Sequence, residues 1–204
     1  MYSMFSYLND NVLQDLPIGD GGLQYAQQFL PQEQADRLLA ELIIQVRWQQ
    51  AEIRLFGKNV VTPRLSCWMG DASAVYRYSN TTFLPEPWLE SIFALKHQLE
   101  TVAGSSFNSV LLNYYRNGQD AMGWHSDDEP ELGQQSVIAS VSLGAERRFL
   151  LREKTKNARS MTLQLAHGSL LLMKGNSQQR YQHALPRTAK PIGARINLTF
   201  RKIL

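Results

Sequence analysis

The segment Arg195-Ile196-Asn197-Leu198-Thr199-Phe200-Arg201 alternates polar and apolar side chains without a break. Side chains two residues apart in a β-strand lie on the same face, so a strand with one apolar and one polar face is expected over residues 194–201. The apolar face would meet the core. The polar face carries two arginines, and guanidinium groups pair with carboxylates through two hydrogen bonds. An ordinary half-exposed strand with cationic side chains would show the same alternation.

Further short strands precede this segment. Glycines separate them at turn-like intervals, and they are expected over residues 107–115, 136–143, 148–152, 161–165 and 169–173. Six or more short strands at this spacing, after helices, favour a β-sandwich or jelly roll braced by helices on one side. The sequence therefore predicts an α+β, mainly β fold.

Two amphipathic helices are expected before these strands. Apolar residues recur every three or four positions over 35–46, after Pro31, and again over 88–102, after Pro87. Both helices are most simply packing elements against a sheet. Residues 51–83 between them read as short strands broken by glycine and proline.

The composition narrows the class of protein. The 204 residues are 44% hydrophobic and 19% charged, which fits neither a disordered chain nor a membrane protein. The N-terminus has no basic residue before Arg37, and Asp10, Asp15 and Asp20 argue against a transit peptide. The single Cys67 excludes an internal disulfide framework and fits a reducing compartment. We expect an intracellular, cytoplasmic protein.

The charge is mildly positive, at +3, and one segment concentrates it. Six of the thirteen residues from Arg147 to Arg159 are basic. A solvated hairpin face would show this pattern, and so would a surface for an anionic polymer.

Three residues raise the question of a metal. His125 and Asp127 are two residues apart, so both side chains reach the same side of an extended segment, and His183 is a candidate third ligand. Two histidines and one carboxylate leave a face of the metal open, as in non-haem Fe(II) oxygenases, whereas zinc prefers a closed tetrahedron. Spacing alone leaves the metal undecided. His97 is expected to face solvent, and His167 to lie in a structural turn before a glycine.

Asn113 and Tyr115 repeat the two-residue spacing. Their amide and phenol can reach the same anion as the arginines of residues 195–201. A chelating cosubstrate with two carboxylates, one on the metal and one on an arginine, would explain these residues together.

With these motifs in place, the sequence resembles the AlkB family of Fe(II)- and 2-oxoglutarate-dependent nucleic-acid demethylases, most of all the members that repair double-stranded DNA. The resemblance covers about residues 50–204. It is carried by Asn113-Tyr114-Tyr115, His125-Ser126-Asp127-Asp128-Glu129, Ala139-Ser140-Val141-Ser142-Leu143-Gly144, Ala166-His167-Gly168-Ser169, His183 and residues 195–201.

The resemblance implies a double-stranded β-helix core with Fe(II) held by His125, Asp127 and His183. Its cosubstrates would be 2-oxoglutarate and O2. The 2-oxoglutarate ligands would be Asn113, Tyr115, Arg195, Asn197 and Arg201, with Arg195 and Tyr115 at the distal carboxylate. Oxidation of an N-methyl group would yield succinate and carbon dioxide, then release formaldehyde and restore the base.

The family also implies contacts to DNA. A hairpin over residues 53–60 would present Phe56 as a wedge that fills the gap left by a flipped base, with Lys58 beside it. Tyr78 and the His125 ring would stack on that base. The remaining candidate contacts are Arg64, Tyr76, Asp128 and Glu129. Without the family, Phe56 is equally well explained as a core residue.

The resulting organisation is one dioxygenase domain over residues 1–204. It comprises an N-terminal extension and helix (1–50), a nucleotide-recognition region (51–83) and the catalytic β-helix core (107–204). We expect a monomer that acts on DNA, duplex rather than single-stranded, away from membranes, and nuclear if the source is eukaryotic.

Three other functions fit parts of the pattern. One is a demethylase acting mainly on single-stranded DNA or RNA, and another is a non-catalytic nucleic-acid binding module on the same core. The third is a cupin-type jelly roll with a non-redox metal, against which the paired arginines Arg195 and Arg201 argue.

Overall fold

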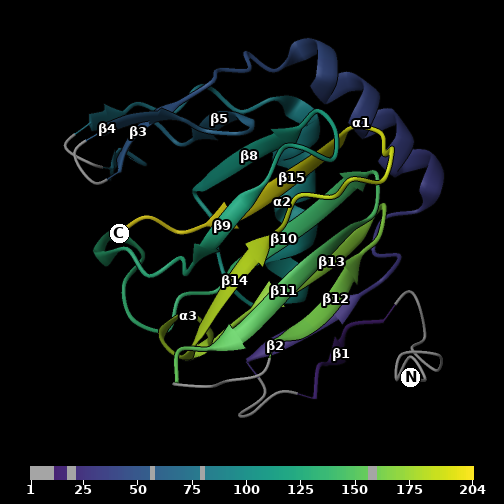
Figure 1. The fold of residues 1–204 in the computed structure, drawn as a ribbon. Coiled ribbons are helices and arrows are strands. Elements are labelled where there is room, and N and C mark those ends of the chain that lie inside the picture. Colours follow the sequence, from purple (N-terminus) through teal and green to yellow (C-terminus); the bar gives the residue numbers. More distant parts are fainter. Residues whose placement is uncertain (1–11, 18–21, 56–57, 79–80, 156–159) are drawn as a thin grey trace.

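The computed structural model describes residues 12–17, 22–55, 58–78, 81–155 and 160–204, and within 53–59 and 76–83 it describes only the backbone. Two antiparallel sheets lie face to face, and the helices α1 and α2 lie outside the larger one (Figure 1). The fold is therefore mainly β with a jelly-roll core, as the strand pattern predicts.

The larger sheet has seven strands among the described residues. Their order is β1 (Gln14–Asp15), β2 (Leu23–Ala26), β13 (Ser169–Met173), β10 (Ile138–Gly144), β15 (Arg195–Arg201), β8 (Ser109–Tyr115) and β5 (Leu65–Gly70). The smaller sheet has the order β12 (Met161–Leu165), β11 (Arg147–Glu153), β14 (Tyr181–Leu185) and β9 (Met122–His125). Strand β15 thus lies inside the larger sheet, between β10 and β8.

Two hairpins stand apart from the sheets. They are formed by β3 (Glu52–Leu55) with β4 (Lys58–Val61), and by β6 (Tyr76–Tyr78) with β7 (Thr81–Phe83). The β3–β4 hairpin projects beside β5, at the upper left of Figure 1. Both hairpins fall in the region expected to hold short strands.

The main core lies between the helices and the larger sheet. Helix α1 (Gln32–Gln45) contributes Leu42, and helix α2 (Glu90–Ala103) contributes Leu95 and Leu99. They share one buried cluster with Leu112 of β8 and Leu198 of β15. Because side chains alternate along a strand, the apolar face of β15 packs against the helices, and its polar face points into the space between the sheets.

A second core fills part of the space between the sheets. It includes Ile138 of β10 and Leu171 of β13 from the larger sheet, and Leu151 of β11 and Leu163 of β12 from the smaller one. This apolar cluster occupies the β12–β13 side. The polar residues of β8 and β15 lie toward the other side, where β9 and β14 face them.

Besides the short strands β1 and β2, which the sequence did not predict, the clearest differences from the sequence-based elements concern α2, β9 and β14. Helix α2 begins at Glu90, because Leu89 at its N-cap has an extended backbone. Strands β9 and β14 were not predicted from the sequence. Each carries a histidine on the face turned toward the larger sheet, so the apolar alternation that identifies a half-buried strand is interrupted.

Two short helices complete the fold. They are the 3-10 helix η1 (Pro130–Leu132) and α3 (Ser177–Arg180), which connects β13 to β14. Among the helices of the described residues, none has the length and apolar character needed to span a membrane.

Candidate metal and cosubstrate site

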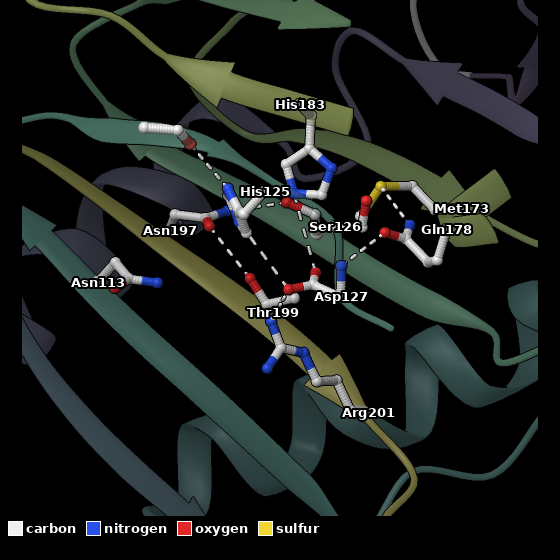
Figure 2. Close-up of polar contacts among 12 residues, drawn as sticks. Asn113, His125, Ser126, Asp127, Met173, Gln178, His183, Asn197, Thr199 and Arg201 are labelled. Carbon is white, nitrogen blue, oxygen red and sulfur yellow. Dashed lines mark hydrogen bonds and ion pairs between the residues drawn. The ribbon is translucent and has the colours of Figure 1, made fainter. Parts of the chain in front are cut away.

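Three potential metal ligands converge at the end of the smaller sheet. His125 at the end of β9 pairs with His183 of β14, and Asp127 follows two residues after His125. The Nε2 atoms of His125 and His183 each lie 3.9 Å from a different carboxylate oxygen of Asp127. One ligand atom from each residue lies within 4.8 Å of the other two (Figure 2). The three side chains can therefore bind one ion, as their sequence pattern predicts.

Both imidazoles turn Nε2 toward the carboxylate of Asp127. His125 Nδ1 lies 2.9 Å from the Gly123 carbonyl, and since a carbonyl only accepts hydrogen bonds, Nδ1 carries the proton. The Nε2 lone pair is then directed to the ligand cluster. His183 is 5% exposed, and burial lowers its pKa to about 4, with opposition from Asp127. This imidazole is therefore uncharged near neutral pH.

Asp127 is held as a carboxylate. Burial alone would raise its pKa, but the Arg201 guanidinium outweighs burial through its charge and its hydrogen bond, so the pKa lies below its ordinary value. Arg201 Nη2 donates to Asp127 Oδ1 over 2.7 Å, and both side chains are almost fully buried. The ligand is thus charged and oriented before any ion binds.

At the opposite end of β15, Arg195 is enclosed by the protein. Its side chain is 2% exposed, and its Nη2 donates to Ser142 Oγ over 2.9 Å. The guanidinium lies over the Tyr115 ring, 5.3 Å from the ring centroid. Burial lowers the pKa of Arg195 to about 10, so the group stays cationic at pH 7. No carboxylate pairs with it among the described residues.

Two buried guanidinium nitrogens are suited to bind an anion. The Nε atoms of Arg195 and Arg201 are buried without a hydrogen-bond partner among the described residues. Buried donors are normally satisfied, and a buried cation is stable only when it is paired. The pocket between them is lined by Asn113, Tyr115 and Thr199 in addition to the metal-ligand candidates. A dicarboxylate beside a metal ion fits this donor set.

The two asparagines on these strands are already bonded. Asn197 Nδ2 donates to Ser140 Oγ over 2.8 Å and to the Val141 carbonyl over 3.0 Å. Asn113 Oδ1 accepts from Arg64 Nε over 2.8 Å. Arg64, expected as a contact to a nucleic-acid strand, therefore bonds a residue that lines the cosubstrate pocket and connects the segment before β5 to β8.

The residues expected to contact a flipped base are only partly described. Phe56 lies outside the described residues, and so do the side chains of Lys58, Tyr76 and Tyr78. Asp128 is about half exposed, and Lys154 Nζ donates to its carboxylate over 2.9 Å. Glu129 directly precedes η1 and lines, with Asp128, a hollow that adjoins Asp127.

The remaining histidines have the expected structural roles. His97 on α2 is exposed and lies 3.1 Å from Glu100. His167 Nδ1 accepts from the Gly144 backbone N–H over 2.7 Å and holds the turn before Gly168. Neither belongs to the metal-ligand cluster.

The basic segment from Arg147 divides into buried and exposed parts. Arg147 is 3% exposed and donates to the backbone carbonyls of Asn117, Asp120 and Pro186, so neither surface interpretation holds for it. Arg152 lies over the ring of Trp124 at 4.0 Å from its centroid. The number of basic residues in a segment does not distinguish buried from exposed arginines, because the carbonyls that surround a buried arginine come from distant parts of the chain.

Sequence reasoning missed one residue that lines the pocket and two that bond residues of the site. Phe149 stacks on the His183 ring, with centroids 5.2 Å apart, and Ser142 holds Arg195. Gln178 bonds the backbone of Asp127. Phe149 and Ser142 lie in predicted strands, so the two-residue period of a strand could have shown which face of the sheet each side chain occupies. No sequence pattern indicated the contact of Gln178.

The fold and the site together define a class. A jelly-roll core with two histidines and one carboxylate beside an arginine pocket is the arrangement of non-haem Fe(II) oxygenases that use a keto-acid. The family model described as the 2OG-Fe(II) oxygenase superfamily matches residues 22–201. Fe(II) is thus the metal, and 2-oxoglutarate and O2 are the cosubstrates.

Similar proteins narrow the class further. The DNA oxidative demethylase ALKBH2 of Homo sapiens is 40% identical over 181 residues, covering 84% of this chain and 69% of that protein. The alpha-ketoglutarate-dependent dioxygenase alkB homolog 3 of Rattus norvegicus is 38% identical over 187 residues, covering 86% and 62%. The chain therefore belongs to the AlkB family of this superfamily. It spans about two thirds of the length of these curated relatives.

A solved structure supports the fold independently. The structure of OsALKBH1 superposes with a TM-score of 0.66 at 18% identity, covering 94% of this chain and 100% of the other. At this identity the likeness concerns the architecture alone.

Proposed function

We propose that this chain removes N-linked alkyl groups from DNA bases by oxidation, coupled to decarboxylation of 2-oxoglutarate. One observation carries the proposal: a single polar face of β15 links the cluster of His125, Asp127 and His183 to the buried, unpaired cation of Arg195. A metal-bound keto-acid with a distal carboxylate requires both features at once. The relatives named as DNA oxidative demethylases supply the substrate class.

In this assignment, His125, Asp127 and His183 hold Fe(II), and the polar residues of β8 and β15 hold 2-oxoglutarate. Arg195 and Tyr115 bind its distal carboxylate, because Arg195 is the buried cation that lacks an anionic partner. Arg201 and Asn113 lie toward the metal-bound end, and Arg201 keeps Asp127 ionised. Asn197 completes the set from the middle of the strand.

The protein residues orient the reactants and exclude water. Fe(II) held by these residues would supply the activation of O2, with electrons from 2-oxoglutarate, so that one oxygen atom would enter succinate with loss of carbon dioxide and the other would hydroxylate the N-methyl group. The hydroxymethyl group would then lose its hydroxyl proton to solvent as the C–N bond breaks. Formaldehyde would leave, and the electron pair of that bond would stay on the base nitrogen. The buried rings of Tyr115 and the stacked Phe149 and His183 shield the pocket from bulk solvent.

Contacts to the DNA follow from the same assignment. A base inside a duplex cannot reach the pocket, so it must leave the stack. We assign its stacking partners as Tyr78 and His125, and its polar contacts as Asp128 or Glu129. Phe56 would fill the gap, with Lys58, Arg64 and Tyr76 as strand contacts. We infer a monomer that prefers duplex DNA and works inside the cell.

The test measures both products of the coupled reaction. Wild-type protein with Fe(II), 2-oxoglutarate and an oligonucleotide carrying 1-methyladenine should release succinate and formaldehyde in equal amounts. Asp127→Ala should abolish both, because the ion loses the only anionic ligand that the proposed protein set supplies. The exposed pair variant Glu33→Ala on α1 serves as control and should leave both unchanged. Succinate release with no base repaired on matched duplex, single-stranded DNA and RNA would refute the substrate class.

A further inference from the structure

The backbone of Asp127 is held by a side chain rather than by a strand. Residues 126–129 follow β9 and lie outside both sheets, so the Asp127 N–H has no ladder partner. It donates instead to Gln178 Oε1 over 2.9 Å (Figure 2). Asp127 is thus anchored twice, through its carboxylate by Arg201 and through its main chain by Gln178.

Gln178 is itself fixed in one orientation. Its side chain is 4% exposed, and its Nε2 lies 3.2 Å from the Met173 sulfur at the end of β13. A backbone N–H can only donate, so the amide oxygen must face Asp127, and the amide nitrogen then faces the thioether. A buried glutamine with both ends engaged has little freedom to rotate.

The hydrogen bond of Gln178 connects the chain segments that carry two of the candidate ligands. It belongs to α3, which leads directly into β14 and His183 five residues later. The hydrogen bond therefore joins the segment that carries Asp127 to the segment that carries His183, across 51 residues of sequence. A second contact, from Ser126 Oγ to the Tyr181 carbonyl at 2.8 Å, joins the same two segments.

We propose that Gln178 is a positioning residue for the iron site, which fixes the main chain of Asp127 relative to His183 so that the ligands are preorganised. The inference rests on the ligand set proposed above. Partners of metal ligands typically change metal affinity by about 10–100-fold when they are removed. Gln178 is not one of the candidate ligands, and its amide oxygen bonds the main chain of Asp127, so its effect on the metal acts through Asp127.

The experiment measures metal affinity without turnover. Mn(II) binding to the apoprotein is followed by calorimetry for the wild type, Gln178→Leu and Gln178→Met, which fill the volume but remove the amide acceptor. Both variants should bind Mn(II) about tenfold or more weakly. Gln179→Leu, the same replacement at the exposed neighbour in α3, should bind as the wild type does.

A second readout separates positioning from packing. The ligand-field spectrum of the Co(II)-loaded protein should change in both Gln178 variants and not in Gln179→Leu, and Met173→Leu should weaken Mn(II) binding by a smaller factor. A lower Tm of the apoprotein with an unchanged Kd and spectrum would overturn the inference, since Gln178 would then only support the fold. If the wild type binds no Mn(II), or Asp127→Ala binds it equally well, the ligand set itself fails.

Discussion

At the scale of single residues, the buried Arg195 cation lowers the stability of the folded protein when no ligand is bound. Its guanidinium is buried, one nitrogen lacks a partner among the described residues, and its pKa is lowered to about 10 by burial. The cation is desolvated without a compensating anion, which is unfavourable unless a ligand supplies one. The pocket is thus incomplete at Arg195 until a carboxylate binds.

We predict that Arg195→Met removes the response to 2-oxoglutarate without unfolding the protein. Saturating 2-oxoglutarate with Mn(II) should raise the wild-type Tm by roughly 5–10 °C, because it binds only the folded state. In Arg195→Met this rise should vanish, while the Tm of the apoprotein should stay equal or increase. Differential scanning fluorimetry measures both. Arg148→Met, at an exposed position of β11, is the matched control. An undiminished rise in Arg195→Met would contradict the assignment.

At the scale of elements, the Glu100 carboxylate connects α2 to the segment that leads into β8. Glu100 Oε1 accepts from the Phe107 backbone N–H over 2.8 Å and pairs with Lys96 at 3.0 Å. Burial would raise the pKa of Glu100, but these two contacts and His97 outweigh it, so the pKa is lower than 4.5. The carboxylate therefore helps to hold the chain where α2 turns toward β8.

We predict that Glu100→Ala lowers the free energy of unfolding by about 2 kcal/mol, because the buried Lys96 and the Phe107 N–H both lose their partner. The folded-state pKa lies below the unfolded one, so this contribution is present above pH 4.5 and is lost as pH falls through the lowered folded pKa. Urea unfolding of the apoprotein at several pH values tests this. Glu100→Gln, which keeps an acceptor, should lose less stability and show a flatter acid dependence. A pH profile identical to the wild type would contradict the prediction.

The strands show which elements a sequence reveals. Strands β12 and β13 begin and end where the pattern predicts, because their residues alternate or are apolar throughout. Strands β9 and β14 were not predicted, since His125 and His183 interrupt the apolar alternation on their inward faces. The helix after Pro87 begins two residues later than its apolar stripe, and Trp88 packs against the core from outside the helix. Functional polar side chains on an inward face thus make a strand harder to predict from its sequence pattern.

At the scale of the whole molecule, the β3–β4 hairpin projects from the β5 edge (Figure 1). A wedge is useful only when a base must leave a duplex, where unstacking costs a few kcal/mol. The Phe56 assignment therefore predicts a difference between substrates.

We predict that Phe56→Ala slows demethylation of duplex DNA about tenfold or more, while the rate on a matched single strand falls less than about twofold. Steady-state kcat/KM on both forms of one methylated oligonucleotide measures the ratio. Phe93→Ala, which removes a partly exposed phenylalanine from α2, should leave the ratio unchanged. Equal losses on both substrates would exclude the wedge.

The sequence by itself determined the groups that lie two residues apart on one strand or extended segment. His125 with Asp127, Asn113 with Tyr115, and the polar face of residues 195–201 follow from the period of a strand, which needs no knowledge of neighbouring strands. The tertiary structure alone decided which distant groups meet. The approach of His183 to His125 depends on the pairing of β14 with β9, and the bond of Gln178 to Asp127 depends on how α3 packs. Such contacts are set by sheet register and by the burial of whole elements, which no local spacing encodes.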